Sequence, residues 1–502
     1  MKMIKNTGLL MVAFSFLLAA CSESFLDRNP KDQLSESTFW KTRQDAEMAL
    51  TGAYGRLQVP HIGAQASGWP PPSLPHWDAM TDNAYTQHDY GFRSASIGQI
   101  EPISGGVISD VYYSCYKGIS ACNIFLEKVD EIEGLDAGLV NQWKGEARFL
   151  RAFWYYYLTE LYGDVPLVLQ TQTLENAYIP KSSKTAILAE MLNDLNFAIE
   201  HLSDGPFSGR VVKGSALALK TRVLLFNEQY TEAAATAEEL VKGSQFSLAE
   251  EYEGLFLEPG QANNPEILFS IGFVNQPGER HYVDLVYGWW NAVLPIQDFV
   301  DEFEMTDGKS IEESPLYDPD NPYDNRDPRL DYIVRVPGEP WPVGVNEAGR
   351  DYWDASLSQT SYSLDKWVDP AKNTIAAMNE SGTDIVHLRL ADVLLMYAEA
   401  KNEVEGPGAE VYEAVNRVRT RPSVDMPPLP EGLSKEEMRN RIRHERRIEL
   451  AFEGIYYFDL KRWKTAHIEI PKIIDTGTQQ PRNFEMKHYL WPLPQSEVDI
   501  ND

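Results

Sequence analysis

Apolar residues recur at helical spacing along residues 141–162, and this pattern constrains the fold of the 502-residue chain more than any other feature. The apolar positions alternate between steps of four and three residues: Trp143, Ala147, Leu150, Trp154, Tyr157 and Leu161. This period places the side chains on one face of an α-helix. A hydrophobic fraction of 43% and a charged fraction of 24% lie near globular averages, so we expect a folded body built on long amphipathic helices.

Further helical segments follow, several of them in pairs. Residues 184–202 carry the same period, residues 214–227 and 231–241 are separated by a tight turn, and residues 387–403 and 408–419 form a second pair. Alanines at the contact positions let paired helices approach closely, and the first pair partly matches the tetratricopeptide pattern. Because stacked helical hairpins need neighbours to bury a continuous core, we expect one superhelical scaffold despite the distance in sequence.

The helical period is lost in two stretches that are dense in Gly, Pro, Asp and Asn. Residues 254–382 form the longer one, and residues 59–106 interrupt the N-terminal half. A loop stretch of this length is unusual without a function. Short strands are predicted where apolar residues alternate, at residues 267–273 and 332–336. We expect a second lobe of loops and small strands.

The N-terminus has the composition of an export signal. Lys2 and Lys5 precede a short apolar run, which ends at Leu18-Ala-Ala-Cys21. The run is too short to cross a membrane, so an uncut anchor is the weaker interpretation. The junction resembles a bacterial lipobox, which implies cleavage after residue 20 and acylation of Cys21, for example with palmitate. Two or three acyl chains would anchor the protein durably.

Charge and cysteine content exclude several classes of protein. Loss of residues 1–20 removes two lysines and lowers the formal net charge from −30 to −32, which disfavours nucleic acid as a partner. Cys115 and Cys122 share one helical face, where seven residues separate them by about 10.5 Å, too far for a disulfide. Neither has a CxxC partner, so we interpret both as small core residues rather than zinc ligands.

Many short motifs occur in one order along the mature chain. They include residues 34–40 (LSESTFW), 78–83 (DAMTDN), 145–152 (GEARFLRA), 161–167 (LYGDVPL), 389–400 (RLADVLLMYAEA), 445–454 (ERRIELAFEG), 458–463 (FDLKRW) and 491–498 (WPLPQSEV). Together they resemble the SusD/RagB family of surface-exposed, glycan-capturing lipoproteins that partner SusC-like TonB-dependent outer-membrane transporters.

The resemblance implies a mainly α fold. About four tetratricopeptide-like units would dock against the transporter, an irregular lobe would carry the ligand site, and the protein would act as a hinged lid. The expected division is a signal peptide at residues 1–20, an N-terminal helical region at 21–253 with a ligand-loop insertion near 59–106, the loop-rich ligand lobe at 254–382, and a C-terminal helical region at 383–502 packed on the same scaffold.

Arginines between residues 439 and 447 are interleaved with glutamates at 437, 445, 449 and 453 on the predicted helix. At helical spacing, opposite charges favour paired or solvated side chains over a basic docking face. Arg148 and Arg151 are likewise expected to form internal ion pairs.

No catalytic or metal motif is complete. His444-Glu445 begins a zincin motif but Ile448 replaces its second histidine, and Phe303 stands where a P-loop before Lys309 requires glycine. Pro322 and Tyr323 break the calcium-loop pattern of the nearby aspartates, so no metal and no cofactor is expected, although a structural calcium stays open. Paired carboxylates of a glycosidase cannot be recognised among 75 acidic residues.

Seven of the twelve tryptophans fall in the two irregular stretches. An indole offers a flat surface to the C–H face of a sugar, while amides and carboxylates fix its hydroxyls; the alternative is that these rings fill the core of the loop-rich lobe. The candidate ligand-binding residues are Trp77, Trp289 and Trp290, followed by Trp69, Tyr85, Trp341 and Trp353, with Asp82, Asn83 and Arg93 as polar partners.

The leading hypothesis is a non-catalytic glycan-binding lipoprotein, anchored on the outer face of the outer membrane, that delivers oligosaccharide to the transporter. A peptide-binding lid of the same kind is the alternative, and a peptide binder would more often present a groove with backbone-pairing edges. A surface glycosidase and a scaffold without a small ligand rank below both.

Overall fold

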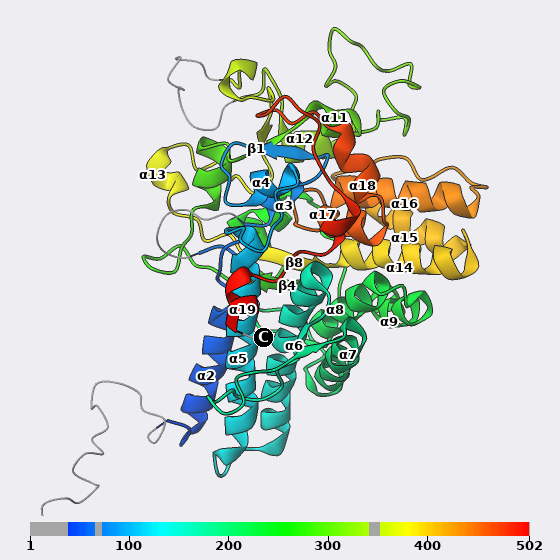
Figure 1. The fold of residues 1–502 in the computed structure, drawn as a ribbon. Coiled ribbons are helices and arrows are strands. Elements are labelled where there is room, and N and C mark those ends of the chain that lie inside the picture. Colours follow the sequence, from blue (N-terminus) through cyan, green and yellow to red (C-terminus); the bar gives the residue numbers. More distant parts are fainter. Residues whose placement is uncertain (1–38, 66–72, 341–351, 501–502) are drawn as a thin grey trace, which may run out of the picture.

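The computed structural model describes residues 39–65, 73–340 and 352–500, and the statements below concern these residues. Figure 1 shows a body of long helices in its lower and right-hand parts and a loop-rich lobe above it. Cys21, Trp69 and Trp341 lie outside the described residues. None of the described helices has the length and apolar character needed to cross a membrane.

The first half of the chain builds the lower helical body. Its helices are α2 (Arg43–Gly55), α5 (Val107–Lys128), α6 (Ala137–Tyr162), α7 (Lys184–His201), α8 (Lys213–Phe226) and α9 (Tyr230–Lys242). Side chains of Thr42, Asp136 and Ser183 cap the N-termini of α2, α6 and α7 by accepting backbone N–H bonds. Successive helices pack on one another, and the apolar face predicted for residues 141–162 is buried along α6.

The C-terminal helices extend the same stack. They are α14 (Leu390–Glu405), α15 (Ala409–Arg419) and α16 (Lys435–Glu449), and α14 packs against α8, α9, α15 and α16. Ala233 and Ala237 of α9 are fully buried, as close helix packing requires. The prediction of a mainly α, single hairpin-stacked scaffold is confirmed. The predicted helical start at His387 is wrong, because this residue lies in a strand, β8 (Ile385–Arg389).

Four small antiparallel sheets hold the irregular regions together. They pair β1 (Ala84–Thr86) with β5 (Val293–Pro295), β2 (Val165–Pro166) with β3 (Lys181–Ser182), β4 (Ile267–Ile271) with β8, and β6 (Val334–Arg335) with β7 (Ser363–Leu364). The strand predicted at residues 267–273 is therefore present. The strand predicted at residues 332–336 is only partly present. Tyr332 belongs to a helical turn, and of the alternating apolar residues only Val334 lies in β6.

Short helices complete the loop-rich lobe and the C-terminus. They are α3 (Pro75–Asp78), α4 (Phe92–Ser96), α10 (Glu258–Gln261), α11 (Gln297–Asp301), α12 (Arg329–Ile333), α13 (Ile375–Met378), α17 (Tyr456–Arg462), α18 (Ala466–Glu469) and α19 (Gln495–Ile500). The last helix returns to lie beside α5 (Figure 1). Cys115 and Cys122 are free and buried, as the spacing predicted.

A buried arginine–glutamate cluster joins the C-terminal helices to the loop-rich lobe. Glu449 of α16 lies 2.9 Å from Arg329 of α12, 2.7 Å from Arg389 of β8 and 2.9 Å from Arg421. All four side chains are at most 1% exposed. Burial alone would raise the pKa of Glu449, but the three guanidinium groups outweigh it and hold the pKa well below its usual range. The carboxylate is thus the charged centre on which four chain segments converge.

The other predicted ion pairs are also internal. Arg151 of α6 forms a bidentate pair with Asp194 of α7, with both N–O distances at 2.8 Å. Arg446 lies 2.9 Å from Asp392 and 3.0 Å from Asp459. The basic run of α16 is therefore largely engaged in ion pairs within the fold, which confirms paired charge over a basic docking face.

Removing the charge of Glu449 should destabilise the protein strongly. Glu449→Gln leaves three buried arginines without their shared carboxylate, so we expect the free energy of unfolding to fall by about 3–5 kcal/mol. Urea unfolding followed by circular dichroism measures it. Glu47→Ala, which breaks the exposed Arg43–Glu47 pair of α2, is the matched control and should change stability by less than about 0.5 kcal/mol. Equal effects of the two substitutions would contradict the role given to the cluster.

The Glu399–Arg462 pair predicts loss of stability in acid. Burial raises the pKa of Glu399, but Arg462 at 2.5 and 2.6 Å more than compensates and brings the pKa down to about 2. A carboxyl group whose pKa is lower in the folded state stabilises the fold above its unfolded pKa, near 4.5, and loses this contribution as the pH falls toward 2.

Thermal unfolding at a series of pH values tests this pair. The difference in melting temperature between the wild type and Glu399→Gln should be large at pH 7 and should shrink between about pH 4.5 and pH 2. A difference that is constant over this range would show that the carboxylate contributes no pH-dependent stability.

Candidate functional site

Two irregular stretches, 200 residues apart in sequence, meet where β1 pairs with β5. The register joins Ala84 to Pro295, Tyr85 to Leu294 and Thr86 to Val293. Because the strands are antiparallel, the segment that follows β1 and the segment that precedes β5 emerge at the same edge of the sheet. Residues 87–91 and 289–292 therefore lie together at the surface, and we call them the paired loops.

Side-chain hydrogen bonds fasten the paired loops to each other. The side-chain amide of Gln87 donates to the carbonyl oxygens of Trp290 at 2.6 Å and Asn291 at 3.2 Å. The Thr86 hydroxyl donates to the carbonyl oxygen of Ala292 at 2.7 Å. Asn291 in turn accepts a hydrogen bond from Ser363 of β7 at 2.7 Å. Each loop is thus positioned by the other and by the sheet beneath it.

Partly exposed rings from both loops form a continuous group. The His88 ring lies 6.4 Å from the Trp290 ring and 6.3 Å from the Tyr90 ring, measured between centroids. Trp289 stands next to Trp290 at the end of a π-helical turn, η4 (Leu285–Trp289), and all four rings are half-buried. Burial lowers the pKa of His88, so its ring is neutral at neutral pH. We call these residues the aromatic face.

The backbone of the paired loops is held in unusual conformations. Tyr90 has φ +42° and Asn291 has φ +50°, both in the left-handed region that residues other than glycine rarely adopt. Gly91, at φ +88°, approaches so closely that a Cβ atom there would lie 2.8 Å from the backbone nitrogen of Val107. These backbone conformations fix the direction of the chain at Tyr90.

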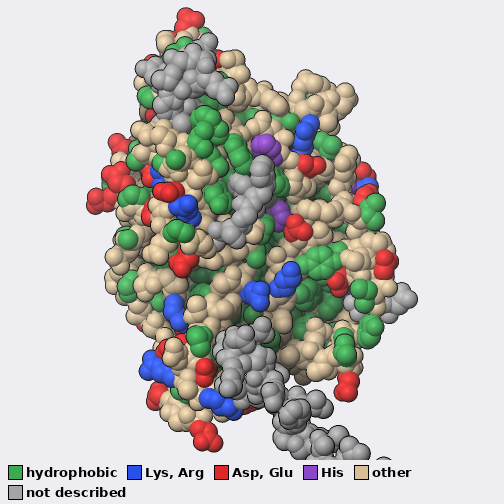
Figure 2. Space-filling view, turned by 90° about the vertical axis from the view of Figure 1, so that its left-hand side faces the viewer, with side chains coloured by type: hydrophobic (Ala, Val, Ile, Leu, Met, Phe, Trp, Pro, Cys, Tyr) green, Lys and Arg blue, Asp and Glu red, His purple; other side chains and the backbone are tan. Residues whose placement is uncertain are grey.

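A small polar cavity borders the first loop. It measures about 230 Å³, and its walls include Asp89, Gly91, Ser94, Gln99 and Ser104. The Asp89 carboxylate accepts hydrogen bonds from the backbone N–H groups of Gly91 and Ser94. Hydroxyl, amide and carboxylate groups are therefore gathered at residues that flank Tyr90 in sequence and at the segment that follows. Figure 2 shows the left-hand side of the molecule, where hydrophobic side chains lie both in the upper half, near histidine side chains, and toward the right below the middle.

Several of the predicted ligand residues prove to be structural. Trp77 is fully buried, donates from its indole N–H to the carbonyl oxygen of His61 at 2.6 Å, and stacks on Trp491 with centroids 5.7 Å apart. Trp353 is also fully buried and donates to the carbonyl oxygen of Ser361. These rings present no face to solvent, so the prediction that Trp77 and Trp353 form a platform is corrected: both fill the core of a loop-rich region.

The polar candidates before β1 are also engaged within the fold. Arg447 of α16 lies 2.9 Å from the Asp82 carboxylate and donates to the side-chain oxygen of Asn83 at 2.8 Å. Tyr85 is only 2% exposed, and the Arg93 guanidinium lies 5.6 Å from its ring centroid. Asp82, Asn83 and Tyr85 therefore position β1 instead of facing a ligand, whereas Arg93 remains half-exposed beside them.

Trp289 and Trp290 are partly exposed and stay candidates, and residues that sequence reasoning missed lie in the same paired loops. Gln87, His88 and Tyr90 were not singled out, although they lie in the predicted ligand-loop insertion near residues 59–106, just after β1. Within the described residues, no group of three His, Cys, Asp or Glu side chains is placed to hold a metal ion. What the aromatic face offers chemically is stacking and hydrogen bonding.

Comparisons with known proteins agree with this architecture. The model of the SusD family matches residues 272–502, and a second model, described as starch-binding and associating with the outer membrane, matches residues 24–225. A SusD-like protein of Formosa agariphila is 27% identical over 99% of this chain and 98% of its own length. The chain belongs to the SusD family.

Solved structures of SusD-like proteins share the fold. A SusD-like carbohydrate-binding protein of Bacteroides fragilis superposes with a TM-score of 0.81 and 28% identity, covering 92% of this chain and 99% of that one. A surface glycan-binding protein of Bacteroides thetaiotaomicron, solved with laminarihexaose, superposes with a TM-score of 0.71 at 16% identity, covering 92% of this chain and 98% of that one. The mainly helical SusD-like architecture is therefore common to these proteins.

Two tryptophan substitutions separate core from surface in this SusD-like protein. Trp77→Ala opens a cavity beneath Trp491 and should lower the free energy of unfolding by about 3–5 kcal/mol. Trp290→Ala removes a half-buried ring and should cost clearly less. Urea unfolding of both variants measures the difference, and a larger loss for Trp290→Ala would mean that the aromatic face is a core element.

Proposed function

We propose that the protein binds oligosaccharide on its aromatic face and that the bound sugar stacks on Trp290 with His88 and Tyr90 beside it. The observation that carries the proposal is the joining of these rings by β1–β5 pairing and by Gln87. A sugar ring has an apolar face of C–H groups that matches an indole, while its hydroxyls need hydrogen-bonding partners close by. The polar cavity lined by Asp89, Ser94 and Ser104 supplies such partners.

The family relationship supports a carbohydrate as the ligand. One of the matching family models is described as starch-binding, and the Bacteroides fragilis relative is a SusD-like carbohydrate-binding protein. The negative net charge of −30 favours neutral over anionic glycans.

In the proposed cellular role the protein is held on the outer membrane by lipid at Cys21. From there it would capture oligosaccharide and pass it to a SusC-like TonB-dependent transporter. The lipobox-like junction at residues 18–21 supports the anchor, and the family description of association with the outer membrane supports the location. Capture and delivery require that the oligosaccharide is bound and released intact. We therefore propose that the protein is not an enzyme.

Calorimetric titration of residues 22–502 tests the proposal. A panel of neutral and acidic oligosaccharides should contain at least one ligand that binds and is recovered intact. Trp290→Ala and His88→Ala should weaken its binding at least about tenfold, because each loses a stacking contact.

Tyr178→Ala, which changes an exposed ring on a different part of the molecule, serves as the matched control and should leave the affinity unchanged. Cleavage of a bound sugar would favour the glycosidase, and binding of peptides alone would favour the peptide-binding lid. Either result, or sugar binding that survives both ring substitutions, would overturn the proposed function.

A further inference from the structure

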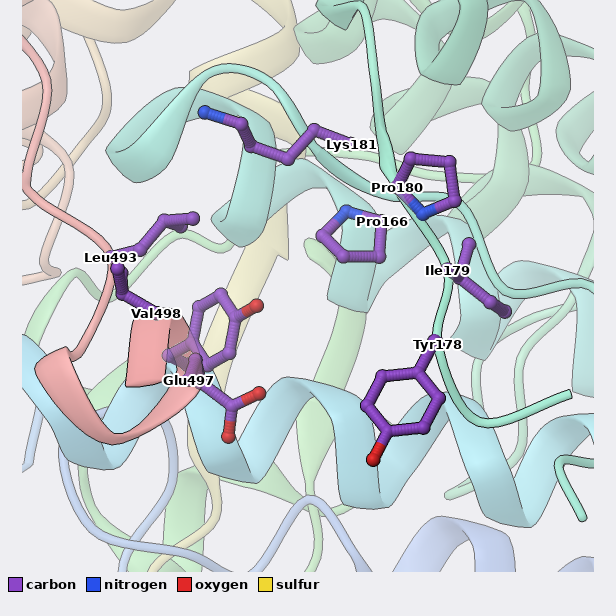
Figure 3. Close-up of a pocket in the computed structure, with 9 residues that line it drawn as sticks. Pro166, Tyr178, Ile179, Pro180, Lys181, Leu493, Glu497 and Val498 are labelled. Carbon is purple, nitrogen blue, oxygen red and sulfur yellow. The ribbon is translucent and has the colours of Figure 1, made fainter. Parts of the chain in front are cut away.

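An open groove lies where the C-terminal helix α19 returns to the helical body. Its cavity measures about 470 Å³ and is bounded by α5, by the β2–β3 pair with the residues just before β3, and by α19 with the residues before it. Figure 3 shows Pro166 and Pro180 on one side, Leu493 and Val498 on another, and Glu497 and Tyr178 opposite the prolines. We call it the C-terminal groove. None of its lining residues belongs to the paired loops or the aromatic face.

Several apolar side chains at the groove are largely exposed to solvent instead of being packed in the core. Tyr178 is 71% exposed and Val498 is 45% exposed, while Leu174 on the same loop as Tyr178 is 95% exposed. A second cavity of about 150 Å³ continues the groove and shares Tyr112 and Glu497 with it. Grouped exposed apolar residues beside a preformed cavity are typical of a binding surface.

The main chain along the groove has unused hydrogen-bonding capacity. The β2–β3 pairing stops at Lys181 and Ser182, and the preceding residues run without regular structure. Tyr178 and Ile179 make no backbone hydrogen bond to any other residue within 39–65, 73–340 and 352–500. Such a segment offers N–H and C=O groups at the surface to a second extended chain.

Charges of both signs stand at the edge of the groove. Neither Lys181 nor Glu497 forms an ion pair with another residue in the part of the chain that the structure describes. Burial and the Glu497 carboxylate together raise the pKa of Tyr112, which places the carboxylate's charge close to this phenol on the groove floor. A ligand with an apolar body and charged groups of both signs complements this arrangement.

We propose that the C-terminal groove binds an extended peptide segment of a partner protein. An apolar or aromatic side chain of the segment would lie between Tyr178 and the two prolines, its main chain would bond to Tyr178 and Ile179, and a basic residue would face Glu497. An oligosaccharide fits less well, because five of the nine lining residues have wholly apolar side chains that cannot bond to its many hydroxyls. The proposal is independent of the glycan function.

A phage-displayed library of random heptapeptides is the probe for this groove. The library is panned against residues 22–502, with Tyr178→Ala protein used to deplete peptides that bind elsewhere. Enriched heptapeptides should combine an aromatic residue or proline with a basic residue. Fluorescence anisotropy of a labelled synthetic copy then gives the affinity.

Tyr178→Ala and Val498→Asp should each weaken the peptide at least about tenfold. Ile375→Asp, at a comparably exposed site on α13, and Trp290→Ala are matched controls and should change the affinity less than about twofold. Thermal unfolding verifies that each variant is folded.

If no heptapeptide separates the wild type from Tyr178→Ala, or if the enriched peptides bind Val498→Asp equally well, the proposal is wrong. It is also wrong if Tyr178→Ala instead abolishes binding of an oligosaccharide, which would make the groove a sugar site. The heptapeptide assay contains no sugar, so its failure would leave the calorimetric result for the aromatic face unaffected.

Discussion

The carboxylate of Glu449, surrounded by three arginines, is the interaction on which the arrangement of the two lobes depends. It gathers α12, β8 and the segment after α15 around α16. A charge buried without a partner would cost several kcal/mol. Each of these segments is therefore held in place by the ion pair that its charged side chain forms in the cluster. The same helix carries Arg447, which binds Asp82 and Asn83 just before β1. Helix α16 therefore contacts the segment before β1 through Arg447, and so helps to position the first of the paired loops.

Sequence patterns predicted the helical scaffold because the buried face of a helix requires apolar residues at a regular spacing in the sequence. The period of residues 141–162 and the paired segments at 214–241 appear as α6, α8 and α9 with boundaries shifted by a few residues. The pattern failed where local periodicity and tertiary pairing compete. His387 has helical neighbours but lies in β8, whose residues on either side of it pair with β4, and Tyr332 alternates like a strand residue but closes a helical turn.

The sequence predicted the region of the candidate site better than it predicted which residues of that region face the solvent. Composition identified the two irregular stretches that meet at β1 and β5, yet tryptophan alone did not separate surface from core. Trp77 and Trp290 both lie in Gly- and Pro-rich sequence, but Trp77 is fully buried against a distant ring, Trp491, that no local pattern connects to it. His88 and Gln87 gain their importance from residues about 200 positions away, and such contacts leave no periodic signal in the sequence.

In the proposed mode of binding, ligand contacts the aromatic face and leaves the buried tryptophans untouched. Fluorine NMR of protein labelled with 5-fluorotryptophan, titrated with an oligosaccharide that binds in calorimetry, tests it most directly. Single Trp→Phe variants assign the resonances. On saturation, the signals of Trp289 and Trp290 should shift, whereas those of Trp77 and Trp491 should stay in place. Saturable binding that moves neither Trp289 nor Trp290 would contradict it.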